Sequence, residues 1–477
     1  MSSLDERTTT ESAAPVGKRG RAWIAYLAMV VLPVAVAFFL LRTGGSGEGH
    51  APAGHAGGAA DPVAKLLFAL PVIFLACRLL SATARRLAQP TVIGEIFAGI
   101  LLGPSFLGWV WPVAYHWIFP DYLASTINTL AQIGLVIFMF LVGYELDVEL
   151  VRRRSKAAVL VSHVSVAIPF LSGVLLAFVL HPTLGAGVDR LPFSLFLAIS
   201  MSITAFPVLA RIITDRKMTK LPIAALALSC AAVDDITAWC LLAVVVAIAS
   251  ATSLAATALT VGLTVAFFAF MLFVVRPLLR RLFAPTEQGQ KALPTMAVVS
   301  VLLAGLLLSA LATNAIGIHP IFGAFLFGAV TPRGSLPIRQ ATEQMHALTV
   351  TLLLPLFFVY TGLRTKFDLI GSDPALWLWT ALIVAVAMLG KWGGSLAAAR
   401  LSGIGRRDAW SLGALMNCRG LTELAVLNIG LDLKVISPTM FAMLVVMTLV
   451  TTVATSPALS LIERYKRRRP AEPLPAA

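Results

Sequence analysis

Long apolar stretches, separated by short polar ones, run along nearly the whole chain. Many of these stretches reach the roughly 17–25 residues that a helix needs to cross a bilayer. They are apolar throughout, whereas the strands of a membrane β-barrel alternate apolar and polar residues in short segments. The pattern therefore predicts an all-α, polytopic membrane protein that lies in a lipid bilayer.

Fourteen apolar segments could span a membrane. They cover approximately residues 23–42, 63–84, 90–107, 124–147, 156–180, 192–214, 221–250, 254–276, 291–312, 317–332, 341–362, 376–400, 409–432 and 436–462. The first could instead be the apolar region of a signal peptide, since basic residues precede it. No clear A-x-A cleavage site lies before the Gly/His-rich loop 44–59, so we expect a retained helix.

The basic residues predict the orientation. Loops that face the cytoplasm are enriched in Lys and Arg. With the N-terminus inside, alternate loops receive nearly all of the basic clusters, which lie at 85–86, 152–156, 216–220, 276–281, 333–339, 406–407 and 465–469. We therefore expect both termini in the cytoplasm and a multi-pass protein of the inner, plasma membrane.

The composition agrees with this picture. Hydrophobic residues make up 58% of the chain and charged residues 13%, which excludes a soluble domain. The net charge of +14 lies in short clusters between apolar segments, so we expect no nucleic-acid partner. The cysteines fall inside predicted spans without a metal-ligand spacing, and we expect buried apolar side chains at Cys77, Cys230, Cys240 and Cys418.

Two distant segments resemble each other. "QPTVIGEIFAGILLGP" (89–104) and "HPIFGAFLFGAVTP" (319–332) share a Pro, a Gly-x4-Gly spacing and a closing Pro. The predicted topology inserts them in opposite directions, as in secondary transporters with inverted repeats. The domain plan that follows is an N-terminal segment 1–62, a first repeat 63–250, a linker helix 254–276, a second repeat 291–462 and a basic tail 463–477.

Under this repeat, span 192–214 corresponds to span 409–432, and both are interrupted. The first contains Thr204 and Pro207, and a mid-helix proline removes a backbone hydrogen bond. The second contains polar residues and a glycine together, namely Asn417, Arg419, Gly420 and Glu423. Irregular backbone at membrane depth survives where it lines a cavity or packs in protein, so paired breaks predict a binding site. A kink without function, or an Arg–Glu pair that only neutralises itself, are the alternatives.

Asp234 and Asp235 lie halfway along span 221–250. Each acid costs about 2.5–3.5 kcal/mol at the centre of a membrane helix, so two in a row require a reason. Neighbouring helical positions point about 100° apart, so one carboxylate can face a cavity while the other pairs with a cation. The candidate cation is Lys391, in the glycine-rich stretch "MLGKWGGSL". Pairing of both acids, or a lysine that snorkels to the interface, are the alternatives.

A buried carboxylate can take a proton or a monovalent cation, but not readily both. Competition of this kind is what an exchanger needs in order to couple two fluxes. We therefore select Asp235, Asp234 and Thr204 as candidate ligands of the cation or proton.

Four motifs together resemble a known family. They are "QPTVIGEIFAGILLGPSFLG", "SITAFPVLARII", "AAVDDITAWCLLA" and "MNCRGLTELAVLNIG". In this order they resemble the monovalent cation:proton antiporter-2 family, in particular bacterial relatives of plant cation/H⁺ exchangers and the membrane domain of the Kef systems. The resemblance covers about residues 63–462. It implies a sodium/hydrogen exchanger-type fold of thirteen helices, with a dimerisation domain and a mobile core that holds two crossed, broken helices. The span 23–42 would be an addition.

The resemblance also implies roles for individual residues. Asp235 matches the ion-binding aspartate, and Asp234 a position that holds Asp or Asn. Lys391 matches the basic residue in the helix before the second broken one. The implied activity is exchange of Na⁺ or K⁺ for H⁺ by a homodimer that works by alternating access. An Asp at 234 resembles members that move more than one proton per cation, so we expect electrogenic exchange.

Three other classes of protein are alternatives to an antiporter. A cation channel or sensor could share the fold, although no selectivity-filter sequence is apparent. An intramembrane aspartyl protease would need acids from two different helices, whereas these two are adjacent. An organic-anion symporter would place neutral polar groups at the two acidic positions. We therefore expect a transporter rather than an enzyme, with no cofactor.

Overall fold

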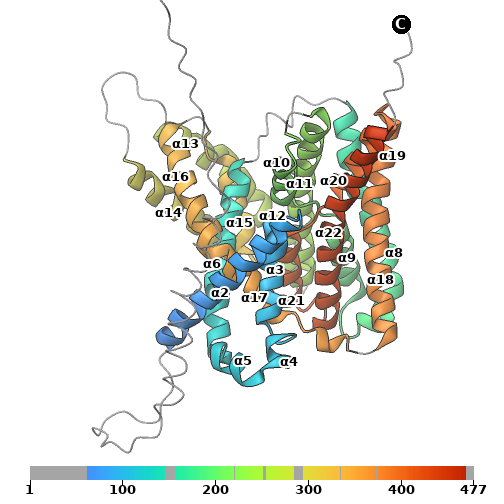
Figure 1. Cartoon of the computed structure of the whole chain (residues 1–477). Helices are drawn as coiled ribbons and strands as arrows, with labels where there is room; N and C mark the ends of the chain where they lie inside the picture. The colour runs from blue at the N-terminus through green and yellow to red at the C-terminus, as the bar shows by residue number, and fades with distance from the viewer. Residues whose placement is uncertain are drawn as a thin grey trace, which may run out of the picture. The chain divides into compact units, whose positions relative to one another are not determined.

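The computed structural model describes residues 62–145, 156–219, 221–250, 254–283, 294–333, 335–371 and 373–468. The predicted span 23–42 and the end of the basic tail lie outside these ranges. Every later predicted span falls on a helical segment, and the described ranges contain helices and no strands (Figure 1). Eleven of their helical segments are long and apolar enough to cross a membrane. The prediction of an all-α, polytopic membrane fold is therefore confirmed.

The helices of the first half follow the predicted spans closely. They are α2 (Pro62–Arg86), α3 (Thr91–Leu102), α4 (Leu107–Val110), α5 (Pro112–Ile118), α6 (Asp121–Glu145), α8 (Lys156–Leu184), α9 (Arg190–Ser202), α10 (Phe206–Asp215) and α11 (Pro222–Ser250). The short helices α4 and α5 were not predicted. Proline begins α5 and lies in the first turn of α10, where its missing N–H leaves no bond unmade.

The second half continues from α12 to α22. Its α-helices are α12 (Leu254–Phe270), α13 (Arg276–Leu282), α14 (Thr295–Ile316), α15 (Pro320–Val330), α16 (Leu336–Leu348), α17 (Leu354–Arg364), α18 (Pro374–Met388), α19 (Gly394–Leu401), α20 (Arg406–Met416), α21 (Leu421–Asp432) and α22 (Pro438–Arg468). A 3₁₀ turn, η3 (Phe367–Leu369), follows α17. Helix α15 has 11 residues and is shorter than the predicted span 317–332.

π-Helical turns join three pairs of these helices. They are η1 (Met271–Val275), η2 (Thr349–Leu353) and η4 (Leu389–Gly393). The first two precede Pro277 and Pro355, and a proline displaces the carbonyl one turn before it. The third holds Lys391 and has no such proline. Isolated π turns often mark functional positions, and this one contains the buried lysine.

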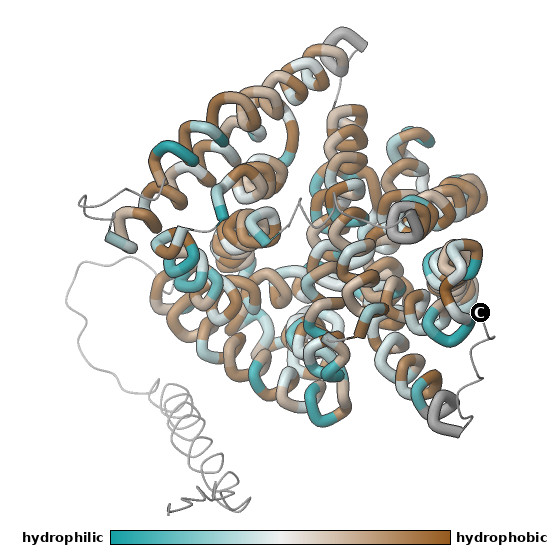
Figure 2. The backbone as a smooth tube through the Cα atoms, turned by 90° about the horizontal axis from the view of Figure 1, so that it is seen from above, coloured by the Kyte–Doolittle hydropathy of each residue, from teal (hydrophilic) through white to brown (hydrophobic). Residues whose placement is uncertain are grey.

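Within residues 60–477, the helices pack in two groups. In one, α3 packs against α2 and α17, and α6 packs against α15 and α17, with α14 beside α15. In the other, α8 packs against α9, α11 and α19, and α20 packs against α19 and α22. Figure 1 shows the two groups side by side. Apolar residues predominate along the helices of both, as membrane segments require (Figure 2).

Glycines set the closest helix crossings of the first group. A Cβ on Gly99 of α3 would overlap the carbonyl oxygen of Phe358 in α17. A Cβ on Gly328 of α15 would overlap the carbonyl oxygen of Phe140 in α6. No side chain fits at either crossing, so the backbones come into contact there.

Candidate ion-binding site at two helix breaks

Both predicted interruptions are present. Helix α9 ends at Ser202 and α10 begins at Phe206, with extended backbone between them. Helix α20 ends at Met416 and α21 begins at Leu421. Each break leaves backbone groups without partners inside its own helix, and at membrane depth such groups must find partners elsewhere.

The two breaks bond to each other. The backbone N–H of Ala205 donates to the carbonyl oxygen of Cys418 at 3.0 Å. The hydroxyl of Thr204 lies 2.9 Å from the carbonyl oxygen of Met416. The two interrupted helices therefore meet at their breaks, far inside the protein, where Thr204 and Cys418 are fully buried.

Asp234 lies among several donors. Its carboxylate is fully buried, and its Oδ2 lies 2.8 Å from Nζ of Lys391. The hydroxyl of Ser165 on α8 lies 3.0 Å from Oδ1 and 2.9 Å from Oδ2. The hydroxyls of Thr204 and Ser162 lie 3.1 Å and 3.4 Å from the same carboxylate. The structure thus brings the predicted acid and lysine together and surrounds the acid with hydroxyls.

Lys391 is fully buried, and its ammonium group points into the protein. Besides Asp234 it donates to the carbonyl oxygens of Ser165, at 2.9 Å, and Ser202, at 2.5 Å. These three acceptors match the three N–H bonds of an ammonium group. The alternative of a lysine that snorkels to the interface is therefore wrong for this side chain.

Two of the glycines near Lys391 face α8. A Cβ on Gly390 would lie 3.3 Å from the hydroxyl oxygen of Ser172, and one on Gly394 would lie 3.2 Å from Cβ of Ile168. A Cβ on Gly393 would meet nothing within 4 Å. Close approach of α8 therefore explains the first two glycines and not the third.

Asp235 has a different environment from its neighbour. It is fully buried, and its Oδ2 accepts the backbone N–H of Phe206, at the start of α10, at 3.3 Å. Its Oδ1 is buried without a hydrogen-bond partner among the described residues. A helix N-terminus stabilises a negative charge, and the second oxygen is available to a cation or a proton. Asp235 is therefore the better candidate for the exchanging group.

Arg419 and Glu423 form a fully buried ion pair, with 3.2 Å between Nη1 and Oε2. The guanidinium also donates to the carbonyl oxygens of Ser200 and Met201, at the C-terminal end of α9. The hydroxyl of Ser200 donates to Glu423 in return. A cation is favourable at the C-terminal end of a helix. The pair therefore connects α21 to α9, in addition to the mutual neutralisation of its two charges.

The second break also forms hydrogen bonds with α22. The hydroxyl of Thr452 accepts the N–H of Arg419 at 3.1 Å and lies 2.8 Å from its carbonyl oxygen. The side-chain amide of Asn417 donates to the carbonyl oxygen of Thr451 at 3.3 Å, and its Oδ1 has no partner among the described residues. A Cβ on Gly420 would lie only 2.5 Å from Cγ2 of Val208. Glycine is therefore required at this position by space.

Several residues of the site were not predicted. They are Ser162 and Ser165 on α8, Ser200 on α9, and Thr451 and Thr452 on α22. Hydroxyls in membrane helices commonly bond a carbonyl of their own helix, as Ser202 does to Ala198. Sequence alone offers no signal that separates the two uses. Pro207 is the second residue of α10 and thereby fixes where the helix resumes after the break.

The cysteine prediction needs one correction. Cys77, Cys230 and Cys418 are buried as expected, whereas Cys240 is exposed on the surface of α11. An exposed thiol on an apolar helix surface is compatible with a lipid neighbour, so position along the span does not decide burial.

The comparison with family models assigns the chain. The model described as "Sodium/hydrogen exchanger, transmembrane" matches residues 72–462. The chain belongs to this family. The match covers both breaks and both acids, so the site described above lies within the region that defines the family. It also agrees with the family that the sequence motifs resemble.

Several curated proteins are similar to this exchanger-family chain. The Na⁺/H⁺ antiporter NhaS4 of Synechocystis is 40% identical over 81% of this chain and 94% of its own. Cation/H⁺ antiporter 19 of Arabidopsis thaliana is 39% identical over 86% of this chain and 52% of its own. K⁺/H⁺ antiporter 1 of Saccharomyces cerevisiae is 33% identical over 84% and 47%. The chain thus spans about half the length of its plant and yeast relatives.

Solved structures agree on the fold. The sodium proton antiporter MjNhaP1 of Methanocaldococcus jannaschii superposes with a TM-score of 0.61, at 15% identity, over 83% of this chain and 96% of that one. At this identity the likeness shows the fold alone. The exchanger-type fold that the motifs implied is therefore confirmed.

Proposed function

We propose that this protein exchanges a monovalent cation, Na⁺ or K⁺, for H⁺ across the membrane by alternating access. The observation that carries the proposal is the state of Asp235. One carboxylate oxygen is held by the first N–H of α10, and the other is buried without a partner among the described residues. Such a group can hold a proton or a cation, and each must leave before the other binds.

The pair of Asp234 and Lys391 gives the exchanger a second place for a proton. Three acceptors, one each from α8, α9 and α11, surround the lysine and match the three N–H bonds of its charged form. If the lysine or its partner changes protonation during the cycle, more than one proton moves per cation. We therefore propose electrogenic exchange, which a response of the transport rate to an imposed membrane potential would support.

The names of the relatives support the class of substrate. NhaS4 is named for Na⁺ and H⁺, the yeast protein for K⁺ and H⁺, and the plant proteins for a cation and H⁺. All of these are cation exchangers by name, and they differ in the cation. For this chain we propose the shared class of substrate, a monovalent cation exchanged for H⁺.

The two groups of helices offer the moving parts. The site lies in the group of α8–α11 and α18–α22, and the other group would be the scaffold against which it moves. We propose that these are the core and dimerisation domains, respectively, and that the protein is a homodimer. We also propose that it lies in the plasma membrane with both termini in the cytoplasm. The resemblance and the basic loops support these assignments.

Matching glycines support the proposed inverted repeat. Gly94 in α3 packs on the backbone of Leu80 in α2, and Gly323 in α15 packs on Ser309 in α14. Five residues later, Gly99 contacts α17 and Gly328 contacts α6. If the repeats are 63–250 and 291–462, with the linker helix 254–276 between them, α2 corresponds to α14 and α6 to α17. The contacts of α3 with α2 and α17 then correspond to the contacts of α15 with α14 and α6.

The test is transport in vesicles. Protein in liposomes with a pH-sensitive dye inside should dissipate a pH gradient when Na⁺ or K⁺ is added, with Li⁺ for comparison. Asp235→Asn should abolish the signal, because an amide cannot exchange a proton for a cation. Asp408→Asn, at an exposed position in the first turn of α20, is the matched control. Full exchange by Asp235→Asn would end the proposal.

A channel is the alternative with the same fold. Ion currents through single molecules, at rates far above those of transporters, would favour it over exchange. A transporter should instead show no resolvable single-molecule current in a planar bilayer.

A further inference from the structure

A polar cavity lies between α2, α3, α10 and the start of α17, apart from the two acids. It has a volume of about 230 Å³, and its lining includes Arg78 and Arg85 of α2, Glu95 of α3 and Arg211 of α10. Arg78 and Arg85 lie seven residues apart, which places both on one face of the helix. We call it the arginine cavity.

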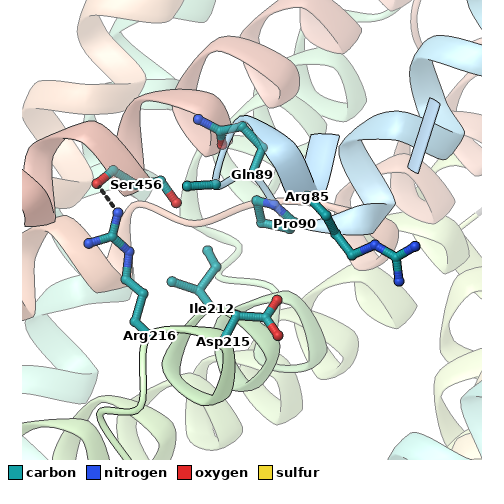
Figure 3. A pocket seen from close by; sticks show the side chains of 8 residues that line it. Arg85, Gln89, Pro90, Ile212, Asp215, Arg216 and Ser456 are labelled. Atoms are coloured by element: carbon teal, nitrogen blue, oxygen red, sulfur yellow. Dashed lines mark hydrogen bonds between the residues drawn. The ribbon is translucent and has the colours of Figure 1, made fainter. Parts of the chain in front are cut away.

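A second cavity adjoins it and shares Arg85. It has a volume of about 340 Å³ and is lined also by Gln89, Asp215, Arg216 and Ser456. Figure 3 shows the guanidinium of Arg216 directed at Ser456, and that of Arg85 directed away from both. Arg216 donates to the carbonyl oxygen of Ser456 at 2.5 Å and to the hydroxyl of Ser460 at 2.9 Å. Arg85 thus borders both cavities, and its charged group points away from the bonded arginine.

The four arginines that line these cavities outnumber the two acids, Glu95 and Asp215, and Glu95 lies close enough to Arg78 and Arg211 to interact with both through charge. Asp215 is paired with Arg211, at 3.1 Å, and Arg216 reaches Glu463 at 3.9 Å. Among the described residues, Glu95 has no basic atom within 4.0 Å, and Arg78 and Arg85 form no ion pair within that distance. At 1.5 Å per residue, Arg78 lies roughly 10 Å deeper along α2 than Arg85. A guanidinium at membrane depth is costly unless an anion or water accompanies it.

We propose that the arginine cavity binds a phosphate group, carried by an anionic phospholipid or free in solution. The planar guanidinium forms paired hydrogen bonds with phosphate oxygens, which makes arginine the preferred phosphate ligand. The apolar stretch of α2 ends at Arg85, so the cavity lies where lipid headgroups meet the protein. Basic pockets between membrane helices at this level are typical binding sites for anionic headgroups.

The position of the cavity gives the ligand an effect on exchange, and this effect rests on the proposed function. Arg78 and Arg85 belong to the proposed scaffold, whereas Arg211 belongs to the proposed core. A phosphate bound by all three holds the two groups in the arrangement seen here. Alternating access requires that arrangement to change, so the bound ligand slows exchange.

Binding can be measured without transport. The full-length protein, purified in a nonionic detergent, is heated with increasing short-chain phosphatidylglycerol, short-chain phosphatidylcholine or inorganic phosphate at constant ionic strength. We expect phosphatidylglycerol, and not phosphatidylcholine, to raise the unfolding temperature in a saturable way. Arg78→Gln/Arg85→Gln should weaken the apparent affinity roughly tenfold or more, because charged hydrogen bonds are lost.

Arg280→Gln/Arg281→Gln is the matched control, since it removes two exposed arginines near the end of α13, away from the cavity. It should bind like the unaltered protein. An equal loss in both double variants would show a general attraction of basic residues to anionic lipid and overturn the proposal, as would no loss in either. A response to inorganic phosphate at similar concentrations identifies a free anion, and a response to phosphatidylglycerol alone identifies a lipid. If the double variant does not fold, Arg85→Gln alone, at the exposed helix end, replaces it.

Discussion

At the scale of single residues, the neighbouring acids of α11 have contrasting partners. Asp234 meets a lysine, a hydroxyl of α8 and a hydroxyl of the break between α9 and α10. Asp235 meets one backbone N–H and keeps one oxygen without a partner among the described residues. Because adjacent helical positions point about 100° apart, the same turn of helix presents one acid to α8 and the other to α10.

Competition at Asp235 predicts a pH dependence of cation affinity. A proton on the carboxylate excludes the cation, so the KM for Na⁺ or K⁺ should rise as the pH falls. In the range where the proton occupies the site, mass action gives about a tenfold rise per pH unit. Initial rates of exchange in liposomes at several pH values and cation concentrations measure this. A KM that stays constant while the maximal rate falls would show that the proton acts elsewhere.

The buried pair predicts a large loss of stability when one partner is removed. Lys391→Ala leaves the Asp234 charge buried without its cation, at a cost of about 3–5 kcal/mol in the free energy of unfolding. Asp234→Asn/Lys391→Met should be less destabilised, because no charge is then left alone. Denaturant unfolding in detergent compares them.

An exposed pair provides the reference for that experiment. Arg339 and Glu343 lie 3.4 Å apart with side chains 69% and 67% exposed. Arg339→Ala should cost less than about 1 kcal/mol, since exposed pairs contribute little. Equal losses for the buried and the exposed variants would contradict the role of burial.

The conspicuous charges could be predicted from the sequence, and the hydroxyls could not. An aspartate or lysine amid apolar residues has few explanations, which is why Asp234 and Lys391 were selected together. Ser165 and Ser162 are ordinary residues of a membrane helix, and only the packing of α8 against α11 gives them a partner. Site residues that are costly to bury in a membrane could therefore be predicted from the sequence, and those that cost little could not.

At the scale of elements, the two broken helices are the distinctive feature. Each break is short and is satisfied mainly by the other, by α11 and by α22. Pro207 and Gly420 indicated the positions of the breaks, since proline and glycine disfavour continuous helix. The π turn that contains Lys391 had no comparable signal in the sequence, because its glycines are equally compatible with a regular helix. The apolar pattern also did not predict the short helices between the spans, α4 and α5.

Gly420→Ala should disturb the second break. The new methyl group would meet Cγ2 of Val208 at 2.5 Å, and overpacking of this kind costs about 1–3 kcal/mol of stability. If the displaced break raises the barrier to exchange by about 1.4 kcal/mol or more, exchange in vesicles falls at least about tenfold. The added change Val208→Ala should partly restore it.

Gly393→Ala is the matched control for that substitution. A Cβ at Gly393 meets nothing within 4 Å, and alanine is favoured over glycine in a helix. Stability and exchange should stay as they are or improve. Similar damage from both alanines would show that the helix, and not the contact with Val208, is responsible.

At the scale of the whole molecule, two groups of helices share a boundary that exchange must alter. The side-chain amide of Gln89, between α2 and α3, donates to the carbonyl oxygen of Val453 in α22 at 3.3 Å. This contact joins the proposed scaffold to the proposed core. If the groups move against each other, it forms and breaks once in each cycle.

A cross-link at this contact should therefore stop transport. In a protein whose native cysteines are replaced, Gln89→Cys and Val453→Cys would be joined by a short, cleavable thiol-reactive linker. Exchange in vesicles should fall at least about tenfold on linking, by the same barrier arithmetic, and recover on cleavage. Each single variant with the linker is the control. Unchanged exchange by the linked protein would mean that the boundary stays fixed.

The order of the spans could be predicted, but not how they group. Apolar membrane helices carry little information on which neighbour they contact, because lipid and protein offer similar surroundings. The close pairs α3–α17 and α6–α15 depend on Gly99 and Gly328, whose spacing was noted only as a repeat. The domains came from a family resemblance. The arginine cavity, which α2, α3, α10 and the start of α17 build together, had no signal in the sequence.

The hydroxyl of Thr204 lies where the two broken helices meet, and it has a single hydrogen atom to donate. That hydrogen can be given to Met416 in the second break or to Asp234, whose acceptor atoms lie 2.9 Å and 3.1 Å away, but not to both. The bond that joins the two breaks and the bond to the acid on α11 therefore compete for one donor, so a single hydroxyl couples three segments of the chain.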